Sequence, residues 1–141
     1  MVPLDELVAW YENLRPDTVA GIARLYAADA HFKDPFNQVR GVAAIERIFR
    51  HMFVQVEAPR FVVTARFPGD DGAMLLWEFH FRTRGLGAQT LCVKGASHLR
   101  FDAAGRVREH RDYWDVAGEL YARLPLIGAP MRLLLRLGAA Q

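Results

Sequence analysis

The chain has one cysteine, Cys92, among its 141 residues. A single cysteine excludes a disulfide within the chain and a zinc site built from several cysteines, so we expect a buried structural thiol. Long apolar runs are also missing, since none reaches the roughly 20 residues that span a bilayer. Asp5, Glu6 and Glu12 interrupt the N-terminal apolar residues, which is unlike a signal peptide. We therefore expect a cytoplasmic protein without a membrane partner.

The chain also lacks a strong excess of one charge. Its formal net charge is +2, and its arginines are scattered rather than gathered into a run. A scattered basic surface without interleaved aromatic residues argues against a nucleic-acid partner. The glycines are isolated turn residues and form no nucleotide-binding fingerprint. No two histidines have helical metal-ligand spacing, so we expect neither a metal nor another cofactor.

Apolar residues make up 52% of the chain, which is enough to build one sizeable hydrophobic core. Apolar spacing of three and four predicts helices over about 4–14, 17–28 and 42–53. A period of two then predicts strands near 61–66, 77–82, 89–101 and 107–114, separated by glycine-containing turns. This order predicts an α+β domain over 1–141, with a curved antiparallel sheet and N-terminal helices in 1–115. Residues 116–141 form a helical C-terminal extension, expected to be a lid or dimer element; a membrane-surface helix is the alternative.

The residues before Pro35 form the most informative stretch. A helical pattern passes into a short strand, and the strand ends where Asp34 precedes the proline. Proline lacks a backbone donor and favours an extended conformation at the preceding residue. Asp34 is therefore expected at the rim of whatever the strand encloses. A carboxylate in an apolar cleft can act as a general base, whereas the structural alternative is a turn acid that binds loop amides near Asn37 and Gln38.

Three segments resemble the NTF2-like superfamily, and most closely its ketosteroid isomerase and SnoaL-like polyketide cyclase branches. They are residues 25–36, residues 41–49, and the pair 99–102 with 105–107. The resemblance implies a cone in which a bent sheet wraps around helices and encloses a deep apolar pocket. It also implies a homodimer formed through the sheet. Activity is less well specified, because this fold carries many unrelated functions.

The resemblance also assigns roles to individual residues. Asp34 corresponds to the general base of ketosteroid isomerases, and Tyr26 to an aromatic residue that supports their pocket. The two oxyanion donors correspond to Trp10, with Tyr11 beside it, and to Ser97. If Trp114 faces inward, alternation places His110 and Asp112 in the same cavity, as an acid/base pair. The structural alternative is a satisfied histidine, with Asp112 paired to an arginine.

An aromatic-rich set is expected to line the hollow and to suit an apolar, polycyclic or terpenoid-like ligand. The expected ligand-binding residues are Trp10, Tyr11, Tyr26, Phe36, Phe49, Phe53, Trp77, Ser97 and Trp114. His80 and His98 alternate with apolar residues and should lie on the outer face of the sheet.

The leading hypothesis is proton transfer next to a carbonyl, in an isomerase or an aldol-type cyclase. A non-catalytic ligand-binding or dimerisation module is the alternative. Epoxide hydrolysis fits less well, because the inward positions of the long strand offer no Arg-x-Asp.

Overall fold

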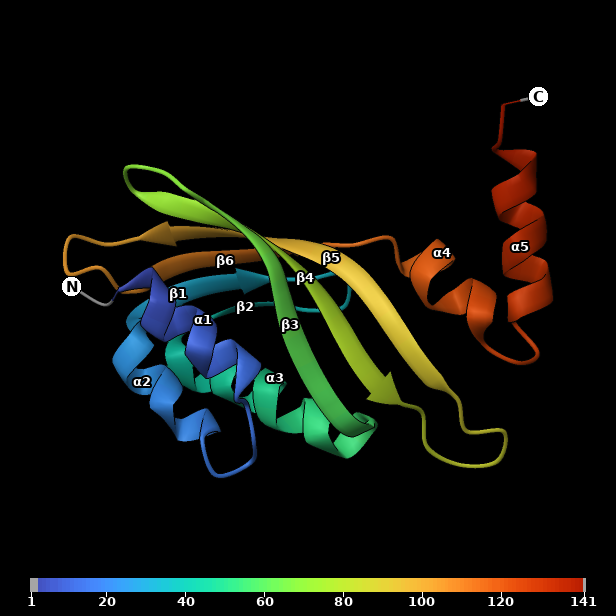
Figure 1. The fold of residues 1–141 in the computed structure, drawn as a ribbon, viewed down its shortest axis with the longest axis horizontal. Coiled ribbons are helices and arrows are strands. Elements are labelled where there is room, and N and C mark those ends of the chain that lie inside the picture. The colour runs from blue at the N-terminus through green and yellow to red at the C-terminus, as the bar shows by residue number, and fades with distance from the viewer. Residues whose placement is uncertain (1–2, 141) are drawn as a thin grey trace.

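Residues 3–140 are described by a computed structural model, in which helices come first, a six-stranded sheet follows, and helices close the chain (Figure 1). The N-terminal helices are α1 (Leu4–Glu12), the 3-10 helix η1 (Val19–Gly21), α2 (Ile22–Leu25) and α3 (Val42–Gln55). They lie together on one side of the sheet, and α1 and α3 both contact it. The α+β class is therefore confirmed.

The sheet is mixed rather than fully antiparallel. Its strands are β1 (Tyr26–Lys33), β2 (Gln38–Arg40), β3 (Glu57–Pro68), β4 (Gly72–Arg82), β5 (Thr90–Phe101) and β6 (Val107–Tyr113). Their order across the sheet is β2-β1-β6-β5-β4-β3, and β1 runs parallel to β6 while all other neighbours are antiparallel. The expected strand at 61–66 is longer and includes Pro59, which an edge strand such as β3 tolerates.

The second predicted helix is shorter than expected. It ends at Leu25 rather than near Ala28, and β1 begins at Tyr26. Alanine favours a helix, but pairing of this segment with β6 overrides that preference. The irregular register between Tyr26 and His31 accommodates the change. As a result Tyr26 is fully buried in the sheet instead of lying on a helix.

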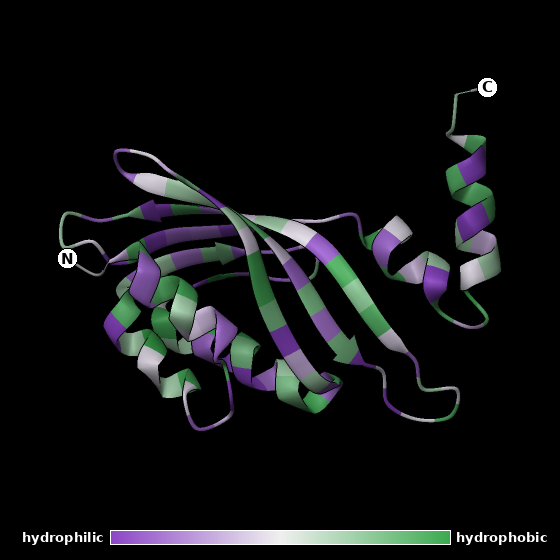
Figure 2. Ribbon diagram, viewed as in Figure 1, coloured by the Kyte–Doolittle hydropathy of each residue, from purple (hydrophilic) through white to green (hydrophobic). Residues whose placement is uncertain are grey.

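The core lies between the helices and the concave face of the sheet. Leu7, Val8 and Tyr11 form the buried face of α1, and Ile45 and Phe49 form that of α3. The strands carry alternating hydrophobic and hydrophilic residues, as Figure 2 shows for β3, β4 and β5. Inward-facing side chains therefore pack on the helices, or remain free to line a space where the helices end.

The C-terminal extension starts with α4 (Val116–Glu119) and η2 (Tyr121–Arg123) and ends with α5 (Gly128–Leu137). Helix α5 stands at the opposite end of the molecule from the N-terminal helices (Figure 1) and packs against α4 and η2. Several of its leucines are exposed, with Leu137 at 73%. Among the described residues, no helix combines the length and apolar character required to cross a membrane.

Candidate active site

A cavity of about 880 Å³ opens between α3 and the concave face of the sheet. The apolar part of its wall includes Phe32, Phe49, Phe61, Phe79 and Val93. Polar side chains reach it from α1, β5 and β6, namely Tyr11, Ser97, His110 and Asp112. An apolar hollow of this volume with a few convergent polar groups is typical of small-molecule sites.

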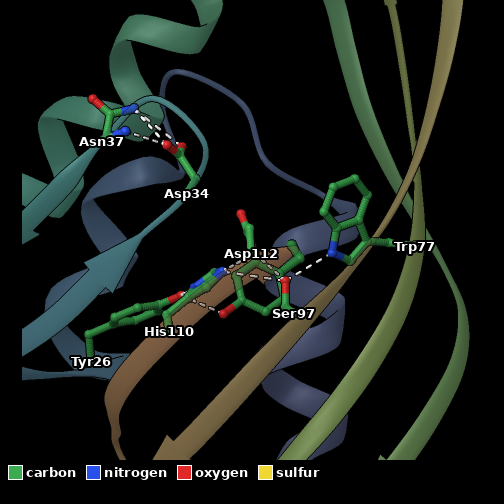
Figure 3. Close-up of polar contacts among 8 residues, drawn as sticks. Tyr26, Asp34, Asn37, Trp77, Ser97, His110 and Asp112 are labelled. Atoms are coloured by element: carbon green, nitrogen blue, oxygen red, sulfur yellow. Dashed lines mark hydrogen bonds and ion pairs between the residues drawn. The ribbon is translucent and has the colours of Figure 1, made fainter. Parts of the chain in front are cut away.

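One hydrogen-bonded chain joins Tyr11, Tyr26, His110 and Asp112, and Figure 3 shows its part from Tyr26 to Asp112. The hydroxyls of Tyr11 and Tyr26 are 2.5 Å apart, and the Tyr26 hydroxyl lies 2.6 Å from Nδ1 of His110. The other ring nitrogen, Nε2, lies 2.7 Å from Oδ1 of Asp112. His110 is only 4% exposed, so its orientation is fixed by these two bonds and by the Phe32 ring 4.8 Å away.

Asp112 is held by its Oδ1 atom and presents its other oxygen to the cavity. Ser97 donates its hydroxyl to Oδ1 at 2.5 Å, and the indole N–H of Trp77 donates to the Ser97 oxygen at 2.9 Å. No described residue hydrogen-bonds to Oδ2 of Asp112. The carboxylate is therefore positioned by β4, β5 and β6 together, with one oxygen available to a ligand.

The hydrogen-bonded chain has a direction, because a hydroxyl carries one proton and can donate only once. When His110 is neutral and donates through Nε2 to Asp112, Nδ1 accepts from Tyr26, and Tyr26 accepts from Tyr11. When both ring nitrogens carry protons, Nδ1 donates to Tyr26, Tyr26 donates to Tyr11, and the Tyr11 hydroxyl is free to donate into the cavity. The number of protons on the His110 ring therefore decides whether the Tyr11 hydroxyl can donate a hydrogen bond into the cavity.

Burial separates the two phenols from water and raises the pKa of both Tyr11 and Tyr26, with the nearby charge of Asp112 adding to the effect. An unfolded chain ionises its phenols near pH 10, so above that pH it binds fewer protons than the native state. The contribution of these phenols to stability is complete below about pH 10 and falls as the pH rises further.

We expect the free energy of unfolding to fall above about pH 10 by up to about 1.4 kcal/mol per pH unit for each buried phenol. Denaturant unfolding between pH 8 and 11 measures this slope. Tyr26→Phe should make the slope shallower, whereas Tyr113→Phe, which changes a half-exposed phenol, should leave it unchanged. Equal slopes in the two variants would contradict the burial of Tyr26.

Asp34 lines the same cavity but is engaged by its own loop. Its Oδ1 accepts the backbone N–H groups of Phe36 and Asn37 at 2.8 and 2.6 Å, and the Asn37 side-chain amide lies within 3.2 Å of both carboxylate oxygens. The strand ends at Lys33, as Pro35 predicts. Figure 3 shows Asp34 apart from the His110 group, and no hydrogen bond between described residues joins them.

Most of the other predicted ligand-binding residues do face the cavity. The wall includes Tyr11, Phe36, Phe49, Trp77, Ser97 and Trp114. Trp10 does not, because α1 turns Tyr11 inward and the Trp10 indole donates to the backbone oxygen of Thr18 at 2.9 Å. Tyr26 lies behind His110, and Phe53 packs against the core, so neither belongs to the wall. Of the pair expected to supply an oxyanion donor from this helix, Tyr11 therefore lies in the cavity wall and Trp10 lies outside it.

The prediction missed part of the wall that α3 and the edge strand supply. Ile48 and Met52 of α3 and Phe61 and Val63 of β3 all line the cavity. The spacing of four on α3 was visible in the sequence. Which strand lies opposite that helix was not visible, because the contact between α3 and β3 is tertiary.

On the outer face of the sheet, His80 and His98 lie where the alternation predicts. Cys92 is half-buried on this face rather than buried in the core. Glu78, His80 and Cys92 form a group of potential metal ligands here, and it is the one such group of three among residues 3–140.

Comparison with known proteins supports the fold. A family model described as a SnoaL-like domain matches residues 7–110. No curated protein gives a significant match. Many solved structures do match this chain significantly. Because their sequence identities to it are low, these matches show the fold alone.

A protein of ketosteroid isomerase-like fold from Catenulispora acidiphila, in complex with trimethylamine, is 17% identical with a TM-score of 0.70, covering 85% of this chain and 92% of its own. A provisionally named SnoaL-like polyketide cyclase from Shewanella denitrificans is 17% identical with a TM-score of 0.68, covering 86% and 100%. TerC, co-crystallised with polyporic acid, is 15% identical with a TM-score of 0.69, covering 82% and 92%.

Proposed function

This chain belongs to the SnoaL-like domain family, within the NTF2-like superfamily, and we propose that it catalyses proton transfer next to a carbonyl in an apolar, polycyclic or terpenoid-like molecule. The observation that carries the proposal is the Asp112 carboxylate, held through Oδ1 by His110 and Ser97 with Oδ2 open to the cavity. The wall around it includes several aromatic side chains, which suit a flat ligand.

In the proposed reaction, Oδ2 of Asp112 takes a proton from the carbon next to the ligand's carbonyl. The C–H electron pair forms the enolate, and its charge collects on the carbonyl oxygen. Tyr11 donates a hydrogen bond to that oxygen when His110 carries protons on both nitrogens. Asp112 then returns the proton to another carbon in an isomerase. In an aldol-type cyclase the enolate carbon instead bonds to a second carbonyl carbon, whose oxygen takes the electron pair and receives the proton from Asp112.

Asp34 is a second acid of the same wall, and Figure 3 shows it apart from the hydrogen-bonded chain. We assign it to the loop rather than to the proton transfer, because its own loop amides occupy both oxygens. This differs from the role that the resemblance to ketosteroid isomerases implies. The family likeness alone does not choose between the two acids.

Deuterium exchange tests the proposal. A panel of polycyclic and terpenoid ketones is screened for binding by ligand-induced thermal stabilisation, and the compounds that bind are incubated with the protein in D₂O. We expect enzyme-dependent deuterium incorporation next to the carbonyl, measured by NMR. Binding without exchange for every compound would favour the non-catalytic ligand-binding module instead.

We also propose that the protein forms a homodimer through the sheet, at the part of its outer face around Leu76 and Tyr113. Exposed apolar side chains there, including Leu76 at 41% and Tyr113 at 48%, support this arrangement. Sedimentation equilibrium should give twice the chain mass of 16.0 kDa. A Leu76→Glu variant is expected to shift the equilibrium toward the monomer, and an unchanged dimer would place the interface elsewhere.

A further inference from the structure

The outer face of the sheet carries a group that the proposed reaction does not use. His80 on β4 and Cys92 on β5 are directly paired across the two antiparallel strands. Glu78 lies two residues before His80 on the same face, with its Oε1 3.1 Å from Nε2 of His80. The Cys92 sulfur lies 3.9 Å from the same nitrogen. All three ligand atoms lie within 4.8 Å of one another.

We propose that Glu78, His80 and Cys92 form a Zn²⁺ site on the outer face of the sheet, with a water completing the coordination. The site lies across the sheet from the cavity, because the alternate residues Phe79 and Val93 face inward. It is therefore independent of the proposed proton transfer, and either proposal can fail alone.

The distances fit a tetrahedral ion. Zinc binds histidine nitrogen and carboxylate oxygen at about 2.0 Å and cysteine sulfur at about 2.3 Å, so ligand atoms on one zinc ion lie about 3.3 to 3.5 Å apart. The distance from Nε2 of His80 to Oε1 of Glu78, 3.1 Å, is slightly below this range, and the distance from the same nitrogen to the Cys92 sulfur, 3.9 Å, is slightly above it. Metal binding would also have to bring the Glu78 oxygen and the Cys92 sulfur to about 3.5 Å, from positions that lie within 4.8 Å of one another.

The donor set favours zinc over magnesium or calcium. Imidazole nitrogen and thiolate sulfur suit zinc, whereas magnesium and calcium prefer oxygen ligands only. Because the ligands come from facing positions on two paired strands, they are arranged before any metal arrives. The set was not evident from the sequence, because Cys92 lies on the next strand and only strand pairing brings it to His80.

The surroundings are partly closed and nearly balanced in charge. Arg123 of η2 donates to the Cys92 backbone oxygen at 2.8 Å and to Glu119 at 2.7 Å, so the C-terminal extension lies beside the site. Burial, Glu78 and Glu119 raise the pKa of the Cys92 thiol, while Lys94 and Arg123 act in the opposite direction. A bound Zn²⁺ would add positive charge and displace the thiol proton.

Metal titration of the full chain tests the proposal. After chelator treatment, Zn²⁺ is titrated in competition with a chromophoric chelator, and Co²⁺ is used to detect a thiolate-to-metal absorption band. We expect one Zn²⁺ per chain, and affinity at least about tenfold weaker in His80→Ala and in Cys92→Ser. His98→Ala is the matched control, since it removes an exposed histidine from the same face of β5, and it should bind as the wild type does.

A second measurement needs no variant. Because Cys92 is the only cysteine in the sequence, the rate of its reaction with a thiol reagent reports on this site alone. We expect stoichiometric Zn²⁺ to slow that reaction at least about tenfold, since a metal-bound thiolate is a poor nucleophile toward the reagent. An unchanged thiol rate, a missing cobalt–thiolate band, or equal affinity in His80→Ala and His98→Ala would each overturn the proposal.

Discussion

Replacement of Asp112 by Asn is expected to lower the rate of carbon-proton exchange by about 10²- to 10⁴-fold, the usual contribution of a positioned general base. The amide oxygen of Asn can still accept from Ser97 and His110, so the packing around it is kept. Its nitrogen takes the place of Oδ2 and cannot accept a proton from carbon. Deuterium incorporation into a bound ketone, measured alongside its dissociation constant, separates loss of the base from loss of binding.

Asp34→Asn is the matched control, because it makes the same chemical change in the other acid of the cavity wall. We expect it to reduce exchange by less than about tenfold, since the Asp34 oxygens accept hydrogen bonds from amides of their own loop. A collapse of exchange in Asp34→Asn, with Asp112→Asn close to wild type, would return the base role to Asp34. That outcome would match the residue correspondence with ketosteroid isomerases and would contradict the assignment made from the hydrogen bonds.

Replacement of His110 by Ala is expected to cost about 3 kcal/mol of unfolding free energy. The change leaves a cavity beside Phe32 and removes the partner that Tyr26 and Asp112 share. The Tyr26 hydroxyl is fully buried and would keep only Tyr11 as a partner. Denaturant unfolding at pH 7 measures the difference between variant and wild type.

His98→Ala is the control for this prediction as well, because it removes an imidazole from an exposed position and should change stability by no more than about 0.5 kcal/mol. If His110→Ala unfolds within about 1 kcal/mol of the wild type, the four-residue chain does not act as a structural unit. The proposed coupling between His110 and Tyr11 would then lose its main support.

The cavity also depends on a residue with no side chain. A Cβ atom on Gly95 would collide with the Trp77 ring, so only glycine at this position leaves room for the indole over β5. The Trp77 indole in turn orients Ser97, which holds Asp112. The sequence places a glycine in a strand, which marks a close approach, but only the fold shows what approaches it.

Local patterns in the sequence determined a large part of this protein. The apolar spacing around Ile45 predicts α3 and the alternation around Phe79 predicts β4, because both periods follow from backbone geometry. Pro35 predicts the end of β1 for a purely local reason. The alternation of His110, Asp112 and Trp114 predicts that they share one face. These inferences hold because each depends on residues that are near one another along the chain.

Tertiary structure alone decided the rest. The pairing of β1 with β6 converts part of a predicted helix into strand and places Tyr26 behind His110. The rotation of α1 directs Tyr11 rather than Trp10 toward the cavity. Strand pairing also brings Cys92 against His80. The physical reason is common to all three, since side chains far apart in sequence meet only through packing and register, which local preferences do not encode.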